Sequence, residues 1–191
     1  MGYRHGDIQE VTLTRDCPAV AVPWGSATTL EAGRVGYISQ QLGGTFTVMV
    51  DGNLYRIDGR HADALGLELE PSEELALGVG NGAPTTAEAV EAAAWKLLAT
   101  CYDPEIPIDI VNLGLVYACE VRPLGDDKFR IDVRMTLTAP GCGMGTLLAD
   151  EARTKLLGIP NVEDVDVELV WDPPWSREMM SESAQLEMGL L

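Results

Sequence analysis

The sequence is poor in the residues that nucleic-acid binding and membrane insertion require. Its 191 residues include 13 Lys and Arg against 30 Asp and Glu, which gives a net charge of −17. Such a surface repels phosphate backbones, so no nucleic-acid partner is expected. No run reaches the roughly 18 apolar residues of a membrane helix, and no apolar segment follows Met1–Asp7 as in a secretory signal. We therefore expect a cytoplasmic protein with no membrane partner.

Cysteine and histidine are also scarce, with four and two residues respectively. The cysteines are scattered (Cys17, Cys101, Cys119 and Cys142) and form no C-x-x-C pair, so a self-contained zinc or thioredoxin site is not expected. The histidines lack metal-ligand spacing, and neither a Gly-rich phosphate loop nor a Ser/His/Asp arrangement is present. In a reducing cytosol the four thiols are expected to be free.

The first half of the chain has the pattern of a small β domain. Short β-branched and aromatic runs, separated by Gly, Pro and Asp, predict five strands: Glu10–Arg15, Ala19–Val22, Arg34–Ser39, Thr45–Val50 and Asn53–Ile57. The intervening Asp51-Gly52 pair predicts a tight hairpin turn, because both residue types tolerate positive φ angles. We predict a small all-β, barrel-like domain over residues 1–80.

In the second half of the chain, segments with helical periodicity alternate with segments that have the pattern of strands. Thr85 and Glu88 have the spacing of a capping box. The elements that follow are a helix through Val90–Cys101, a hairpin of Leu115–Val121 with Phe129–Leu137, a helix over Gly145–Leu157 and a strand over Val165–Trp171. The order α-β-β-α-β predicts a two-layer α/β domain over residues 85–191, so the whole chain is of α+β class.

The hairpin also predicts where polar residues meet. If residues 122–128 turn at one end, the loops that precede and follow the hairpin lie together at the other. Asp103, Glu105 and Cys142 are therefore expected at the same end of the sheet, although about 40 residues separate the acids from the thiol. Thr136 and Thr138 share one face of the strand that leads there. The two acids could serve acid–base catalysis or simply be solvated in a rigid, proline-containing turn.

Cys142 differs from the other cysteines because it lies in the glycine-rich segment Ala139–Gly145, immediately before a helix. Free amides and the helix dipole favour a thiolate there, and the thiolate is the metal-binding form. Such a thiolate could bind iron or a cluster edge if a partner or second protomer supplied further ligands. The alternative is a turn in which cysteine is merely a small residue. Cys101 and Cys119 instead continue apolar faces and are expected to be packed.

Several motifs in this half, in this order, resemble the metal–sulfur cluster biosynthesis domain of MIP type. They are Asp103–Pro107 (DPEIP), Val111–Tyr117 (VNLGLVY), Thr136–Cys142 (TLTAPGC) and Val170–Trp175 (VWDPPW). In the first half, Val11–Val20 and Arg56–Arg60 are similar to the extension of the longer SufT-type proteins of the SUF system. The resemblance implies a non-enzymatic maturation factor that handles iron or an iron–sulfur cluster transiently.

By this resemblance Cys142 is the metal-binding residue, and Asp103, Glu105, Thr136 and Thr138 line its pocket. The implied partners are SUF assembly components, client iron–sulfur apoproteins and a second copy in a homo-oligomer. Two other functions remain open from the residues. One is a metal-free adaptor between the assembly scaffold and its clients. The other is an accessory subunit of an oxygenase-type enzyme, with Cys142 and Asp103 as nucleophile and base.

Overall fold

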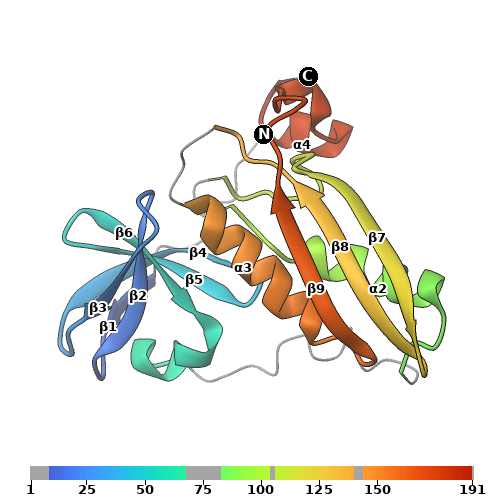
Figure 1. Cartoon of the computed structure of the whole chain (residues 1–191). Helices are drawn as coiled ribbons and strands as arrows, with labels where there is room; N and C mark the ends of the chain where they lie inside the picture. The colour runs from blue at the N-terminus through green and yellow to red at the C-terminus, as the bar shows by residue number, and fades with distance from the viewer. Residues whose placement is uncertain (1–8, 68–82, 104–105, 140–143, 191) are drawn as a thin grey trace. The chain divides into compact units, whose positions relative to one another are not determined.

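The computed structural model describes residues 9–67, 83–103, 106–139 and 144–190. The chain divides into two compact units, Met1–Ser72 and Glu73–Leu191, and each is described by itself. No helix in these described ranges is long and apolar enough to cross a membrane. Figure 1 presents the ribbon of the whole chain, with the elements labelled in chain order.

The first unit is a single antiparallel sheet followed by a short 3₁₀ helix. Its strands are β1 (Gln9–Thr12), β2 (Cys17–Val22), β3 (Ser26–Leu30), β4 (Val35–Leu42), β5 (Thr45–Val50) and β6 (Asn53–Asp58), and η1 covers Gly59–Leu65. The strand order is β1-β4-β5-β6-β2-β3, so β1 and β3 are the edge strands of the sheet. The all-β prediction for this unit is confirmed. Its buried core includes Leu13, Cys17, Val48 and Ile57.

The β5–β6 hairpin turns at the predicted Asp-Gly pair. Asp51 has φ +50° and Gly52 has φ +78°, both in the left-handed region that such a turn requires. The count of five strands was wrong, because β3 (Ser26–Leu30) is a sixth. Its burial pattern explains the omission: four exposed residues precede Leu30, so this edge strand lacks the apolar alternation that marks a half-buried strand.

The second unit has two layers, a three-stranded sheet and two helices. Its elements are α2 (Ala87–Leu98), β7 (Val116–Gly125), β8 (Lys128–Met135), α3 (Met144–Leu157), β9 (Val162–Leu169), η2 (Arg177–Met179) and α4 (Glu182–Glu187). The strand order is β7-β8-β9, with β7 and β8 antiparallel and β8 and β9 parallel. The helix α3 connects the two parallel strands, as such a connection requires. The predicted order α-β-β-α-β is confirmed.

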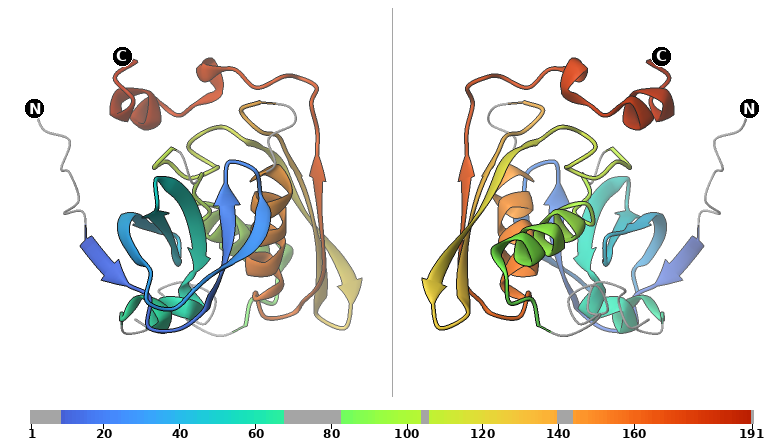
Figure 2. Two further views of the ribbon diagram at one scale, coloured as in Figure 1. Left: turned by 90° about the vertical axis from the view of Figure 1, so that its left-hand side faces the viewer. Right: turned by 90° about the vertical axis from the view of Figure 1, so that its right-hand side faces the viewer.

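Both long helices cover the same face of this sheet. α2 packs on β7, α3 packs on β9, and the two helices contact each other (Figure 2). The strand β8 lies in the middle and alternates as predicted, with Phe129, Ile131, Val133 and Met135 all buried. The charged residues that alternate with these along β8 lie on the opposite face of the sheet. The capping prediction was off by one residue, because the side chain of Thr86, not Thr85, accepts a hydrogen bond from the Ala89 N–H at 3.2 Å.

After β9 the chain continues into η2 and α4, which pack back on the second unit. Met180 and Ala184 are buried in the same core as the two helices. Ser181 caps α4, since its Oγ accepts a hydrogen bond from the Ala184 N–H at 3.2 Å. Leu186 and Met188 remain exposed. This C-terminal segment, Val170–Leu190, is called the tail below.

Candidate functional site

The three strands of the second unit bring distant segments together at one end of the sheet. The N–H of Thr136, just after β8, donates to the Leu115 carbonyl, just before β7, at 2.8 Å. The N–H of Val170, just after β9, donates to the Met135 carbonyl, also at 2.8 Å. The turn of the β7–β8 hairpin lies at the far end, around Asp126 and Asp127. The geometry deduced from the hairpin is therefore correct for the described residues.

The loop that contains Asp103 is tied to the same end through its backbone. The Leu115 N–H donates to the Ile110 carbonyl at 2.9 Å, and the Ile110 N–H donates to the Cys101 carbonyl at 2.9 Å. The side chain of Asp103 turns inward on its own loop, where Oδ1 accepts from the Ile106 N–H at 3.1 Å. A half-buried carboxylate with a loop partner supports the turn interpretation of this residue.

Asp109 organises the loop, and the sequence reasoning missed it. The residue is buried, and its Oδ1 accepts from the N–H groups of Val111 (3.0 Å) and Asn112 (2.9 Å). Its Oδ2 accepts from the Asn112 side-chain amide at 2.7 Å. This is the hydrogen-bonded Asx pattern that holds a turn. An Asp directly before a short apolar run, with Asn three residues later, was the signal available in the sequence.

Hydrogen bonds also connect the tail to this loop. The indole Nε1 of Trp175 donates to the Leu113 carbonyl at 2.8 Å, and the Ser181 N–H donates to the Asn112 carbonyl at 2.9 Å. Gly114 has φ +71° and lies so close to the tail that a Cβ there would stand 2.1 Å from the Met179 carbonyl oxygen. The packed tail and the loop therefore form one structure at this end of the sheet.

Of the predicted pocket residues, Thr136 has an unusual environment. Its side chain is fully buried at 0% exposure, and its Oγ1 has no hydrogen-bond partner among the residues that the structure describes. A buried hydroxyl without a partner is destabilising, so it requires an explanation. Thr138, two residues further on, is half-buried. Glu105 and Cys142 lie outside the described residues, and their predicted roles stay predictions.

The three described cysteines are all buried and free of disulfides. Burial raises the pKa of the Cys119 thiol to about 12. Burial is also the largest cause that raises the pKa of Cys17, although the nearby Arg15 opposes it. A neutral, buried thiol is a poor nucleophile and a poor metal ligand. The structure thus gives Cys17, Cys101 and Cys119 the environment of packing residues.

No metal site is complete within the part of the chain that the structure describes, since no three His, Cys, Asp or Glu side chains gather there. Any iron held here would need Cys142, Glu105 or a partner's side chains in addition.

Comparison with known proteins identifies the second unit. A family model described as iron-sulfur cluster assembly protein matches residues 91–169. The Fe-S protein maturation auxiliary factor SufT of Staphylococcus aureus is 48% identical over 88 residues, which cover 46% of this chain and 96% of that protein. YitW of Bacillus subtilis, also named an Fe-S protein maturation auxiliary factor, is 38% identical over 103 residues, covering 54% of this chain and 97% of its own length. The chain belongs to the iron–sulfur cluster assembly protein family.

The fold agrees with this assignment. A crystal structure of a domain of unknown function from Bacillus anthracis superposes with a TM-score of 0.50 at 35% identity, covering 55% of this chain and 96% of that one. The family resemblance read from the sequence motifs is confirmed. The matched region of the family model begins at residue 91, so it does not include the six-stranded first unit. The similarity of that unit to the extension of SufT-type proteins stays a prediction.

Proposed function

We propose that this protein is a non-enzymatic, cytoplasmic auxiliary factor in iron–sulfur protein maturation, and that it handles iron or a cluster transiently through Cys142. The single observation that carries the role is the family: relatives covered over most of their length are named Fe-S protein maturation auxiliary factors. A further relative, which this chain matches over 20% of that protein, is named an iron-sulfur cluster carrier protein. Client iron–sulfur apoproteins and SUF assembly components are the partners that this role requires.

The choice of Cys142 as the ligand is supported by its sequence position and by the other cysteines. It stands two residues before Met144, where α3 begins, and after Thr136 and Thr138. The first turn of α3 contains no acidic residue that would oppose a thiolate. The remaining three cysteines are buried, which leaves Cys142 as the candidate for thiolate chemistry.

One thiolate is too few for a cluster, which usually takes four. Carboxylate oxygens of Asp103 and Glu105 are harder ligands that suit iron in transit rather than a bound cluster. We therefore infer that the remaining ligands come from a client or from a second copy of the chain. A shared site releases its guest when the two proteins separate, which is the behaviour a maturation factor needs.

The proposal is tested by the activation of a [4Fe–4S] apoenzyme supplied with limiting ferrous iron and sulfide under anaerobic conditions. Wild-type protein should raise the activation rate above that of iron and sulfide alone. Cys142→Ala should abolish this increase. Cys119→Ala, which removes a thiol from the buried core, is the matched control and should retain it. A Cys142→Ala variant as active as the wild type would refute iron handling by this thiol and favour the metal-free adaptor.

A further inference from the structure

The helix-free face of the sheet in the second unit carries a ladder of ion pairs. Arg130 lies in the middle, where its Nε contacts Asp132 at 2.8 Å and its guanidinium also reaches Asp164. Arg122 pairs with Glu120 at 3.0 Å. Bases on this face thus have acidic neighbours, as expected in a chain with more than twice as many acids as bases.

Arg134, at the upper end of β8, departs from this pattern. Its side chain is exposed, and among the described residues it makes neither a hydrogen bond nor an ion pair. Its register neighbours are Ala118 on β7 and Glu168 on β9. Although Glu168 is next in register, its carboxylate is not within ion-pair distance, so the guanidinium is left available.

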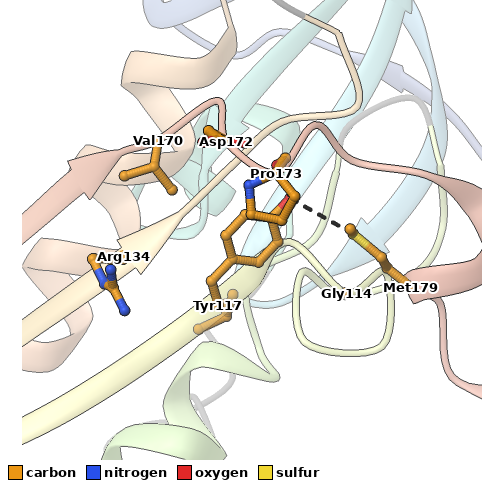
Figure 3. A pocket seen from close by; sticks show the side chains of 8 residues that line it. Gly114, Tyr117, Arg134, Val170, Asp172, Pro173 and Met179 are labelled. Carbon is orange, nitrogen blue, oxygen red and sulfur yellow. Dashed lines mark hydrogen bonds between the residues drawn. The ribbon is translucent and has the colours of Figure 1, made fainter.

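Arg134 lines a pocket of 460 Å³ between the sheet and the tail (Figure 3). The apolar part of the wall comes from Val116, Tyr117, Val170, Pro173 and Met179. Gly114 and the exposed carboxylate of Asp172 complete the lining. Figure 3 shows the Tyr117 ring between Arg134 and Met179. Of the predicted iron-site residues that the structure describes, neither Asp103, Thr136 nor Thr138 lines this pocket.

The wall is held in place by the tail. The Tyr117 hydroxyl donates to the Pro173 carbonyl at 2.8 Å and lies 3.6 Å from the Met179 sulfur. Because this hydroxyl already has partners, the ring presents its apolar surface to the pocket, while Arg134 supplies the cationic group of the described lining. A preformed wall lowers the entropic cost of binding a ligand.

We propose that this pocket binds a segment of a partner protein in which one carboxylate side chain is flanked by apolar residues. The planar guanidinium of Arg134 is suited to a carboxylate, with which it forms two parallel hydrogen bonds. The Tyr117 ring and Met179 provide apolar contacts for the flanking side chains. This inference goes beyond the proposed iron handling, and it requires neither iron nor Cys142.

Two observations define the ligand. Arg134, Asp172 and Pro173 are all exposed, so the pocket is open to solvent, whereas small-molecule sites bury most of the surface of their ligand. A protein segment, in contrast, gains contacts outside the pocket. Asp172 in the pocket wall and the acids Asp166 and Glu168 on the neighbouring strand would repel a run of acids, whereas one carboxylate can pair with Arg134 alone. A single carboxylate is therefore favoured over an acidic stretch.

The test uses two capped pentapeptides, alanine-leucine-glutamate-leucine-alanine and its glutamine counterpart, titrated into the isotope-labelled full chain and followed by NMR. The glutamate peptide should shift the amides of Tyr117, Arg134 and Val170, with a Kd on the order of 1 mM for so small an interface. The glutamine peptide should bind about threefold more weakly, the scale of one exposed ion pair. Salt at 0.5 M should remove most of this difference, since screening weakens exposed pairs.

Variants separate Arg134 from the general charge of the face. Arg134→Gln should abolish the preference for glutamate, and Arg134→Lys should keep part of it. Arg122→Gln, which removes a paired arginine from the same face, is the matched control and should leave the preference unchanged. Equal binding of the two wild-type titrations, shifts located outside the pocket, or an equal effect of Arg122→Gln would each overturn the proposal. Iron uptake by Cys142 is unaffected by any of these outcomes.

Discussion

Gly114 gives the sharpest test of how the loop and the tail form one structure. Replacing it with alanine places a Cβ 2.1 Å from the carbonyl oxygen and 2.6 Å from the carbonyl carbon of Met179. Both atoms belong to the backbone, so no side-chain rotation relieves the clash. The tail must move away, and residue 114 must also hold φ +71° with a side chain.

The magnitude can be estimated from these contacts. A non-glycine residue in the left-handed region costs about 1 kcal/mol or more. Displacing the tail breaks the hydrogen bonds from Trp175 to Leu113 and from Ser181 to Asn112, at about 1 kcal/mol each. Partial exposure of Met180 adds about 1 kcal/mol. Gly114→Ala should therefore destabilise the docked tail by about 3–5 kcal/mol.

Hydrogen exchange of the Ser181 amide measures this directly, because that N–H donates to the Asn112 carbonyl. Its protection should fall by at least about a hundredfold in Gly114→Ala, as about 3 kcal/mol requires. The matched control is Gly189→Ala, which has a similar φ of +69° but no heavy atom within 4 Å of the added Cβ. Protection within tenfold in the two variants would refute the close approach between residue 114 and the tail.

Three further predictions concern the buried polar groups of the second unit. Asp109→Ala removes the acceptor of two backbone N–H groups and should lower the urea midpoint, at a loss of about 2 kcal/mol, while Asp109→Asn should recover part of it. Thr136→Val removes a buried hydroxyl that has no partner within the described part of the chain and should stabilise the protein by about 1 kcal/mol in thermal unfolding; a lower midpoint would mean that the hydroxyl has a partner. Burial raises the pKa of the Cys119 thiol from its ordinary 9.0 to about 12 in the folded protein. The contribution of this thiol to the free energy of unfolding is therefore fully present below pH 9, and it falls by up to about 1.4 kcal/mol per pH unit above pH 9. Cys119→Ala should show a correspondingly flatter alkaline loss of stability, and equal slopes would contradict the raised pKa.

The sequence was sufficient to predict the elements in which apolar residues recur at short, regular intervals. The alternation from Phe129 to Met135 predicted β8, and the period from Leu148 to Leu156 predicted α3, because each element buries one face. The same periodicity correctly placed Cys101 and Cys119 in the core. Where two neighbours were chemically equivalent, local pattern could not choose between them.

The helix cap illustrates this limit. Thr85 and Thr86 are both capable caps, and only the path of the chain into α2 selects Thr86. The strand β3 escaped prediction for a related reason, since its only buried residue is Leu30 and its position at the sheet edge requires little apolar surface. Neither the choice of Thr86 as the cap nor the presence of β3 can be derived from the local sequence alone.

Hairpin topology predicted that the start of β7 and the end of β8 lie together, while the roles of the predicted site residues stay predictions. What escaped prediction depends on contacts between residues far apart in the chain. The bond from Tyr117 to the Pro173 carbonyl joins positions 56 residues apart, and it creates the wall beside Arg134. By its place in the sequence, two residues after Asp132, Arg134 belongs to the charged ladder, but its side chain has no ion-pair partner among the described residues.

The central claim, that Cys142 handles iron, is tested most directly by anaerobic reconstitution with ferrous iron and sulfide. Iron would be counted and absorption spectra recorded for the wild type, Cys142→Ser and the buried-thiol control Cys101→Ser. The account predicts sub-stoichiometric iron and sulfur-to-iron absorption in the wild type and in Cys101→Ser, and neither in Cys142→Ser. Equal iron in wild type and Cys142→Ser, or no iron in any of the three proteins, would contradict it.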